Sequence, residues 1–389
     1  MTKSYSDFSL SFSHFKNPSA KNFDYKHQHI LSLKGFELAN KEITSWDNYK
    51  PTPLHSFSDM AGETGVTSIL YKDENPRFSL KSFKALVGAY AVANLLIKKL
   101  KELGIDANSS DLISGVYKKE TSKFTVCCAT DGNHGRSVAW GAQQFGCNCE
   151  IYIHRNVSIG REKAIAKYGA LVNRIKGNYD DSVRIAAEVA ESNNYTVVSD
   201  TSYEGYTDIP KDVMQGYTVM VDEALKQMGE TPTHVFLQGG VGGFPSAVVS
   251  FLVESLDCPP IFIVVEPINA DCLFQSAVNG EPTAVHGGLD KAIYIAEVPY
   301  TPGIDLRVDP ASPAFAAVNQ VLGLTLNPQV GSVVRKNADC IVSQGEQPGA
   351  NGISALCLGP DWWLLTGTAN IAALLKPVQE AHHISVVDV

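Results

Sequence analysis

Lys84 is a charged residue beside a surface that the sequence pattern buries. In the run NPRFSLKSFKALVGAYAV, Phe83, Leu86, Val87 and Tyr90 repeat with the spacing of a buried helix face. An ammonium group there has two interpretations. Its stem can pack on the core while its charge reaches water. Alternatively, burial lowers the pKa of the lysine, which frees the amine to act as a nucleophile and later as a general base.

A glycine-rich turn, GGVGGF, joins the strand-like run THVFLQ to the apolar run PSAVVSFLV. It contains Gly239, Gly240, Val241, Gly242 and Gly243. Backbone N–H groups can converge on an anion in such a turn, and the helix N-terminus that follows favours negative charge. The turn lacks the lysine of a nucleoside-triphosphate loop and has only the first half of a dinucleotide fingerprint. A single phosphate monoester fits better, and tight packing of the strand on the helix is the alternative.

Two further turns combine a carboxylate with other polar side chains. DGNHGR follows the strand-like run FTVCCAT and contains Asp131, Asn133 and His134, while SDTSYEGYTDIP places Asp200 at the end of another strand. Asn133 can recognise a hydroxyl or phenolate oxygen of a ligand. His134 is expected to orient its loop. Each aspartate, taken alone, is also explained as a helix cap.

A phosphate cradle, a polar group for a ligand oxygen and a lysine on an apolar face together indicate pyridoxal 5′-phosphate. We expect this cofactor to form a Schiff base with Lys84.

The elements that must position these turns alternate along the chain. Strand-like runs cover 67–72, 124–130, 150–154, 195–200, 233–238 and 261–266, and helical patterns cover 79–101, 134–146, 158–169, 178–193, 209–228 and 242–255. This alternation predicts one or two parallel α/β sheets, in which ligands bind at the carboxyl ends of strands. The first 60 residues are expected to form an irregular arm or a peripheral layer rather than part of a core. After about residue 286 the pattern weakens, and we predict no elements there.

Composition limits the class of protein. The chain has 389 residues, which suits two domains or one domain with an inserted lobe. Its net charge of −9 argues against a nucleic-acid surface and a polybasic membrane patch. No apolar run has the length of a membrane span, and the N-terminus lacks the apolar core of a signal peptide. Its eight cysteines show no metal-site spacing, so we expect free thiols, no metal and the reducing cytoplasm.

Several longer runs occur in the order seen in diaminopropionate ammonia-lyases. They are RFSLKSFKALVGAYAV, ATDGNHGRSVAWGAQQFG, SIGREKAIAKYGA, SDTSYEGYTDIPKDVMQGYTVM, THVFLQGGVGGF and VVEPINADC. From about residue 65 to 280 the chain therefore resembles this family of pyridoxal-phosphate enzymes, which belongs to the tryptophan-synthase β-like group of fold type II. The resemblance implies an α/β fold of two lobes, each with a mainly parallel sheet flanked by helices. A large cofactor-binding domain would comprise residues 1–89 and 222–389, and a small inserted domain residues 90–221.

The resemblance also assigns roles to cofactor-binding residues. Lys84 is similar to the Schiff-base lysine of the family, with Phe83 before it, and Asn133 to the residue that hydrogen-bonds the 3′ oxygen of the cofactor. The turn from Gly239 to Gly243 resembles the phosphate loop. Thr366, in the run LLTGTANI, offers a hydroxyl group where the family binds the pyridine nitrogen.

Two carboxylates match a pair that the family is proposed to use for opposite enantiomers. In that scheme Asp131 takes the α-proton of a D-substrate, and Lys84 or Asp200 takes that of an L-substrate.

The late chain departs from the family pattern. SQGEQPGANG keeps Gly345, Glu346, Gly349 and Ala350 with two extra residues between them, and HGGLDKAIYIAEVP replaces another family segment. The resemblance implies α,β-elimination of D- or L-2,3-diaminopropionate to pyruvate and ammonia, by a cytoplasmic homodimer that binds no nucleic acid and no membrane. The alternatives are a dehydratase or ammonia-lyase for serine, threonine, hydroxyaspartate or phenylserine, and a catalytically silent, cofactor-binding regulatory protein.

Overall fold

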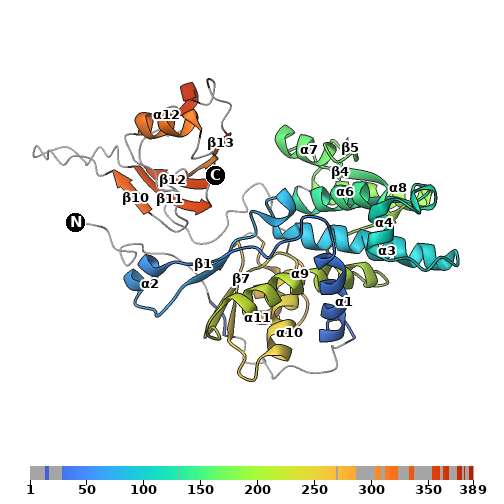
Figure 1. Ribbon diagram of the computed structural model, residues 1–389, viewed down its shortest axis with the longest axis horizontal. Coiled ribbons are helices and arrows are strands. Elements are labelled where there is room, and N and C mark those ends of the chain that lie inside the picture. Colours follow the sequence, from blue (N-terminus) through green and yellow to red (C-terminus); the bar gives the residue numbers. More distant parts are fainter. Residues whose placement is uncertain are drawn as a thin grey trace, which may run out of the picture. The chain divides into compact units, whose positions relative to one another are not determined.

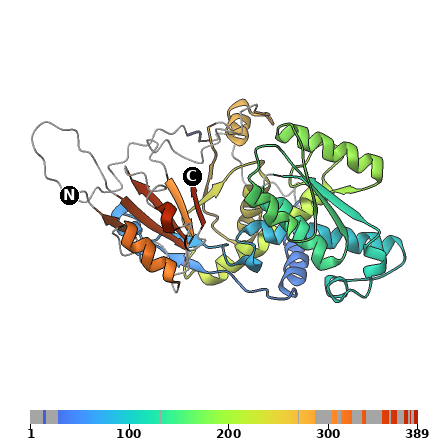
Figure 2. The same ribbon diagram turned by 90° about the horizontal axis from the view of Figure 1, so that it is seen from above.

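The computed structural model describes most of the chain up to residue 285 and separate stretches beyond it (Figures 1 and 2). The described residues are 14–16, 29–130, 132–268, 270–285, 303–307, 312–322, 333–336, 353–359, 362–367, 375–378, 381 and 385–388. Two compact units comprise residues 1–13, 53–73 and 296–389, and residues 14–52 and 74–295. This grouping differs from the two lobes expected from the sequence, and the boundaries of those lobes stay a prediction.

The unit of residues 14–52 and 74–295 is an α/β structure. Its helices are α1 (Leu33–Thr44), α3 (Val87–Glu102), α4 (Ser109–Ser114), α5 (Lys118–Thr121), α6 (Asn133–Phe145), α7 (Ile159–Ala166), α8 (Tyr179–Asn193), α9 (Asp208–Gln227), α10 (Gly243–Ser255) and α11 (Cys272–Asn279), with two 3₁₀ helices, η3 (Arg77–Ser79) and η4 (Phe83–Leu86). Its strands are β3 (Thr125–Ala129), β4 (Asn148–Ile153), β5 (Leu171–Arg174), β6 (Thr196–Val197), β7 (His234–Gln238) and β8 (Ile261–Val265).

The strands of this unit pair in parallel, as the alternating pattern predicts. Four strands follow the order β5-β4-β3-β6, and β7 pairs with β8. Alternate side chains of β3 point to opposite faces: Cys127 packs towards Ala186 and Ala190 of α8, while Val126 and Cys128 belong to the main core with α3 and α6. A parallel sheet covered by helices on both faces explains the nearly continuous apolar run of β3.

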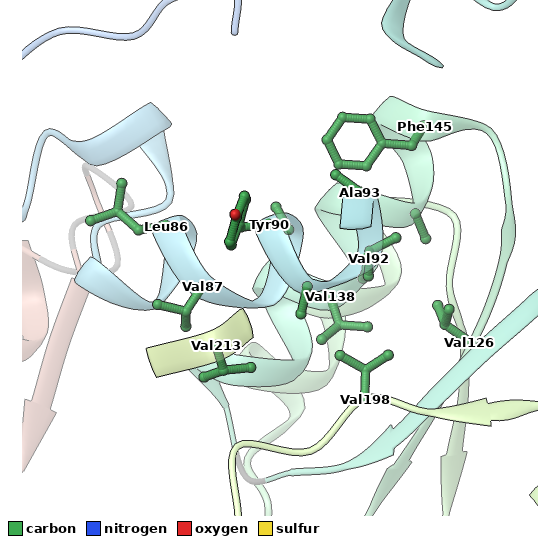
Figure 3. Close-up of a cluster of buried hydrophobic side chains, with 14 of the residues drawn as sticks. Leu86, Val87, Tyr90, Val92, Ala93, Val126, Val138, Phe145, Val198 and Val213 are labelled. Carbon is green, nitrogen blue, oxygen red and sulfur yellow. The ribbon is translucent and has the colours of Figure 1, made fainter. Parts of the chain in front are cut away.

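The main core surrounds α3. Figure 3 shows Val87 and Val92 of α3 among Val138 of α6, Val213 of α9 and Val198, which precedes the Asp200 turn. Small residues let the helix backbones approach closely. A Cβ atom at Gly141 would lie 2.7 Å from the Cα of Ala89, and one at Gly216 would lie 2.8 Å from the carbonyl oxygen of Leu86. The two helices that flank α3 are therefore fixed against it by backbone contact.

The other unit is mainly antiparallel. Strands β1 (Leu54–Ser56) and β2 (Leu70–Lys72) pair antiparallel, with α2 (Ser58–Thr64) between them in the chain. A five-stranded sheet has the order β10-β11-β12-β9-β13. Its strands are β9 (Gly303–Arg307), β10 (Val333–Lys336), β11 (Ile353–Gly359), β12 (Trp362–Gly367) and β13 (Ser385–Asp388), and α12 (Pro313–Leu322) belongs to the same unit.

Four sequence-based expectations need correction. The first 60 residues contain α1, which begins after the capping side chain of Ser32 and buries Ala39 and Ile43. The strand predicted at 67–72 lies in an antiparallel pair, and β5 was not predicted. The helix expected over 79–101 begins only at Val87, because the backbone before it turns through residues with positive φ.

Among the helices of the described ranges, none has the length and apolar character needed to cross a bilayer.

Candidate active site

Lys84 forms a partly buried ion pair. It lies in η4, where the side chain of Ser82 caps the helix by accepting a hydrogen bond from the Lys84 backbone. Lys84 Nζ donates to Asp200 Oδ2 and to the hydroxyl of Tyr217, both at 2.7 Å. Burial alone would lower the pKa of Lys84, but the charges and hydrogen bonds of Tyr217 and Asp200 raise it above its usual value. The expected lowering of this pKa is therefore wrong here, because a carboxylate accompanies the amine.

Asp200 follows β6, and its side chain is 21% exposed. Its Oδ2 atom faces two nitrogens, Lys84 Nζ and, at 4.0 Å, His134 Nδ1. Burial would raise the pKa of Asp200, but the protonated form of His134, the charge of Lys84 and the hydrogen bond from Lys84 all lower it, and together they hold it well below its usual range. Asp200 is therefore a carboxylate at neutral pH.

His134 lies in the first turn of α6 and is buried. Its Nε2 atom lies 2.9 Å from the carbonyl oxygen of Val198. A carbonyl oxygen only accepts hydrogen bonds, so Nε2 carries the proton. Among the described residues, Nδ1 has no hydrogen-bond partner. Burial lowers the pKa of His134, so the ring is neutral in this arrangement.

Tyr217 completes the cluster and was missed in the sequence. It lies on α9, is 1% exposed, and its ring centroid is 5.6 Å from that of Phe83 and 5.3 Å from that of Phe244. Lys84 Nζ lies 5.8 Å from the centroid of the Phe83 ring and 5.4 Å from that of Tyr217. The only sequence signal was a tyrosine in the run MQGYTVM, on the face of a helix that is otherwise apolar there. Such a residue is usually packing, and the pattern cannot show that its hydroxyl meets an ammonium group.

The glycine turn lies beside this cluster. A Cβ atom at Gly243 would lie 3.7 Å from the carbonyl oxygen of Asp200. Gly242 has a φ of +92°, a conformation that favours glycine, and α10 begins directly after it. Its Gly242 cap forms no side-chain hydrogen bond to the first turn of α10. A Cβ atom at Gly240 would meet no described atom within 4 Å, so the turn has open space there. The Gly239 N–H donates to the carbonyl oxygen of Val265 at 2.7 Å, while the N–H groups from Gly240 to Gly243 have no backbone acceptor among the described residues. This donor set suits a phosphate group.

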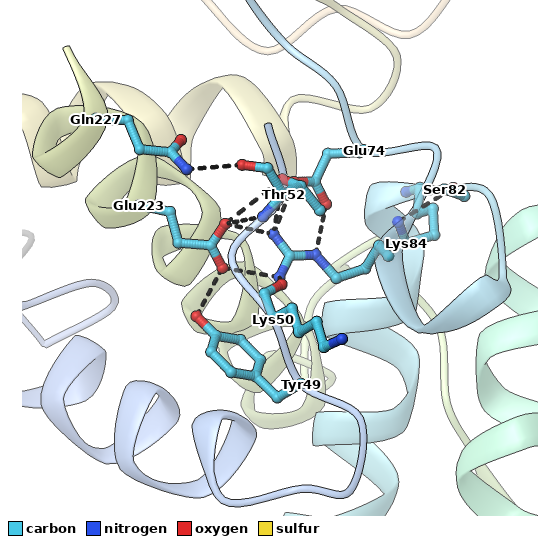
Figure 4. A network of polar contacts seen from close by, with 9 residues as sticks. Tyr49, Lys50, Thr52, Glu74, Ser82, Lys84, Glu223 and Gln227 are labelled. Atoms are coloured by element: carbon cyan, nitrogen blue, oxygen red, sulfur yellow. Dashed lines mark hydrogen bonds and ion pairs between the residues drawn. The ribbon is translucent and has the colours of Figure 1, made fainter. Parts of the chain in front are cut away.

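A second cluster of charges, centred on Arg77, is buried (Figure 4). Arg77 is 1% exposed, and its guanidinium donates four hydrogen bonds of 2.7–2.8 Å to Glu74 and Glu223. Its Nη1 and Nη2 atoms also reach the carbonyl oxygen of Lys50 at 3.3 Å and the hydroxyl of Thr52 at 3.2 Å. Between Arg77 and Lys84 the chain passes through Phe78, Ser79 and Lys81, which all have positive φ.

The structure brings together most of the predicted site residues that it describes. Lys84, Phe83, Asp200 and the turn from Gly239 to Gly243 are neighbours. Asn133 is the first residue of α6, directly before His134, and is exposed.

Other predicted residues have no described place in the site. Asp131 lies outside the described residues, as do the runs HGGLDKAIYIAEVP and SQGEQPGANG with Gly345, Glu346, Gly349 and Ala350. Thr366 belongs to β12 in the other unit.

This chain is similar to a known protein family and to several characterised proteins. A family model described as "Pyridoxal-phosphate dependent enzyme" matches residues 46–325. The diaminopropionate ammonia-lyase of Escherichia coli (strain K12) is 42% identical over 264 residues, which is 67% of this chain and 65% of that protein. The corresponding enzyme of Salmonella typhimurium is 40% identical over 252 residues, or 62% of each chain. The chain thus spans slightly less than two thirds of the length of these curated relatives.

Solved structures give similar matches. The holo diaminopropionate ammonia-lyase from Escherichia coli is 39% identical, with a TM-score of 0.66 over 72% of each chain. The processed form of threonine deaminase isoform 2 from Solanum lycopersicum matches over 74% of each chain with a TM-score of 0.55. At 18% identity, this second likeness concerns the fold alone.

Proposed function

Because the chain belongs to the family of pyridoxal-phosphate-dependent enzymes, we propose that it eliminates ammonia from 2,3-diaminopropionate, in the D form, the L form or both. The products are pyruvate and two ammonia molecules, with one water consumed. The observation that carries the proposal is the contact of Lys84 Nζ with Asp200 Oδ2 beside a glycine turn with free backbone donors. The names of the relatives at 40–42% identity supply the substrate.

The family's cofactor is pyridoxal 5′-phosphate, and the described residues suit it. Lys84 would bind it covalently through Nζ, under the ring of Phe83. The turn from Gly239 to Gly243 would bind its phosphate at the N-terminus of α10 through the N–H groups of Gly240, Val241, Gly242 and Gly243, since the Gly239 N–H already donates to Val265. The exposed amide of Asn133 is available for its 3′ oxygen, and the hydroxyl of Thr366 is proposed as the partner of its pyridine nitrogen.

When bound, pyridoxal 5′-phosphate withdraws electrons from the bonds at the substrate α-carbon, which acidifies the α-proton. The residues of this chain then have to move protons. Lys84, as a free amine, or Asp200 would take the α-proton of the L-substrate, and Asp131 that of the D-substrate. The C–H bond at the α-carbon and the C–N bond at the β-carbon break, and a carbon–carbon double bond forms. The departing amine needs one proton from a general acid of the site.

Domain boundaries, assembly and compartment belong to the same proposal. A large domain of residues 1–89 and 222–389 with a small domain of residues 90–221 would place the Asp200 loop and α9 as far as Val221 in the small domain, and the end of α9 with α10 in the large one. We propose a homodimer in the cytoplasm that binds an amino-acid substrate and no nucleic acid. Six of the eight cysteines are free thiols, which suits a reducing compartment: Cys127, Cys128, Cys147, Cys149, Cys258 and Cys272.

Absorbance and pyruvate formation test this function. The purified chain, loaded with pyridoxal 5′-phosphate, should show the band of a lysine-bound cofactor, and Lys84→Ala should lack it. D- and L-diaminopropionate should each be tested for pyruvate with a coupled dehydrogenase. Serine would give pyruvate, and threonine, hydroxyaspartate or phenylserine the corresponding 2-oxo acid. If one of these forms and diaminopropionate is not turned over, that amino acid is the substrate in place of diaminopropionate. A loaded chain that turns over none of these would be the regulatory protein.

A further inference from the structure

We propose that His134 is a positioning residue that takes a proton at Nδ1 whenever Lys84 becomes uncharged, so that Asp200 keeps a positively charged neighbour. This inference rests on the proposed function, in which Lys84 acts as a base. It adds a fourth group to Lys84, Asp200 and Tyr217, and it gives a purpose to a buried nitrogen that has no partner among the described residues.

The geometry fixes which nitrogen is available. The carbonyl oxygen of Val198 holds the Nε2 proton at 2.9 Å and so sets the orientation of the ring. Nδ1 then presents its lone pair within 4.0 Å of Asp200 Oδ2. The same oxygen accepts the hydrogen bond from Lys84 Nζ at 2.7 Å. One carboxylate oxygen therefore faces both the amine and the imidazole.

The charges of the cluster explain why a proton is needed. A lysine acts as a base only after losing its own proton. Asp200 would then be a largely buried carboxylate without an ion-pair partner, which is unfavourable. If the proton from Lys84 Nζ passes to His134 Nδ1 by way of Asp200 Oδ2, the summed charge of the three groups stays at zero. No bond other than those to the moving proton changes.

The surroundings leave His134 as the group that can take this proton. The positive charge of Lys84 lowers the pKa of His134, and the negative charge of Asp200 raises it. When Lys84 loses its positive charge, the negative charge of Asp200 remains and raises the pKa of His134. Tyr217 on α9 and Cys128 on β3 also act on this cluster electrostatically, but burial raises the pKa of both, so both are already protonated at neutral pH.

Nuclear magnetic resonance of the full-length chain tests the proton position without cofactor. The imidazole nitrogens of the chain, labelled with ¹⁵N, report which ring nitrogen is protonated, and His134→Gln identifies the His134 signals among those of ten histidines. Lys84→Met removes the charge, and Lys84→Arg is the matched control that keeps it. We expect Lys84→Met to raise the pKa of His134 by at least about one unit, and Lys84→Arg to leave the ring neutral. A ring that stays neutral in both variants, or titrates alike in both, overturns the proposal.

Kinetics of His134→Gln give a second readout that does not need Lys84→Met to fold. Glutamine can still donate to the Val198 carbonyl but cannot hold a proton. We expect kcat to fall by at least about 10-fold with little change in KM, and the pH profile of kcat to shift. An unchanged pH profile with lower stability would make His134 a structural residue only. If the chain turns over no diaminopropionate, the proposed function fails, while the resonance experiment still decides the position of the proton.

Discussion

The molecule has two clusters of charges, a buried one around Arg77 and a partly buried one around Lys84, seven residues further along the chain. They differ in how completely their groups are paired. All three nitrogens of the Arg77 guanidinium hydrogen-bond to Glu74 or Glu223, and its Nη atoms also reach further oxygens (Figure 4). Around Lys84, by contrast, Nζ has two described partners, while the nearby His134 Nδ1 has none among the described residues. The first cluster is saturated, and the second has a vacant acceptor.

The chemistry of the two cations matches this difference. A guanidinium keeps its proton at any physiological pH and binds carboxylates in a planar fork, which suits an anchor. An ammonium beside a carboxylate, a phenol and an imidazole can exchange protons with them. Phe78, Ser79 and Lys81, with positive φ, lie between the two clusters, and each such residue costs about 1–3 kcal/mol when held in a sparsely populated conformation. The Arg77 cluster fixes the beginning of this segment, and η4 fixes its end.

Lys84→Ala is expected to have the largest effect on activity. The variant loses both the covalent attachment of the cofactor and a base, so kcat/KM should fall by at least about 10³-fold. A pyruvate assay with each enantiomer measures this. Residual activity within about 10-fold of the wild type would remove Lys84 from the chemistry, provided that circular dichroism shows an unchanged fold.

Arg77→Met is expected to have the largest effect on stability. It leaves Glu74 and Glu223 buried without their cation, and breaking a buried ion pair in this way costs about 3–5 kcal/mol of unfolding free energy. Urea unfolding measures the change. Arg77→Lys is the matched control, since it keeps the charge but loses the fork, and it should cost less. Equal stability of Arg77→Met and the wild type would contradict the role of an anchor.

Asp200→Asn should separate the two enantiomers. It keeps the shape of the side chain but removes the carboxylate that pairs with Lys84 and His134. We expect kcat/KM for the L-substrate to fall by about 10²-fold and that for the D-substrate to fall less. Equal losses for both enantiomers would mean that Asp200 serves the cofactor or the lysine rather than one face of the substrate.

Tyr217→Phe removes one hydroxyl and keeps the packing with Phe83 and Phe244. The expected loss of unfolding free energy is smaller, about 1–3 kcal/mol, because Lys84 retains its hydrogen bond to Asp200. Removal of the hydroxyl should lower the pKa of Lys84, since Tyr217 raises it. The pH profile of cofactor attachment, compared with that of the wild type, measures this shift. A profile identical to that of the wild type would rule out a contribution from the hydroxyl.

The smallest expected effect is a loss of unfolding free energy in acid, which comes from Asp200 of the Lys84 cluster. The folded pKa of Asp200 lies below its usual value of 3.8. Its stabilising contribution is therefore complete above that pH and is lost as the pH falls towards the folded pKa, by up to about 1.4 kcal/mol per pH unit. The difference in unfolding free energy between the wild type and Asp200→Asn should shrink below pH 3.8. A difference that stays constant with pH would show that Asp200 is not ionised in the folded chain.

The sequence predicted all the parallel strands but β5, and the turns that follow them, because hydrophobic period and glycine position are local properties. Lys84, Asp200 and the glycine turn were found in this way. Arg77 and Tyr217 were not, because their importance depends on partners far along the chain: Glu223 is 146 residues from Arg77, and Lys84 is 133 residues from Tyr217. The antiparallel strands beyond residue 302 were missed because that stretch combines many prolines with short apolar runs.

The glycine contacts of α3 also bear on how this chain can diverge. Gly141 brings α6 against α3, and Gly216 brings α9 against the end of η4, with no side chain between the backbones. These elements carry His134, Tyr217 and Lys84. The spacing of the cluster therefore depends on two hydrogen atoms in place of side chains, while the outer faces of the same helices are free to vary. Related chains can change most of their surface without altering the proton-exchanging groups, but a methyl group at either glycine would push those groups apart.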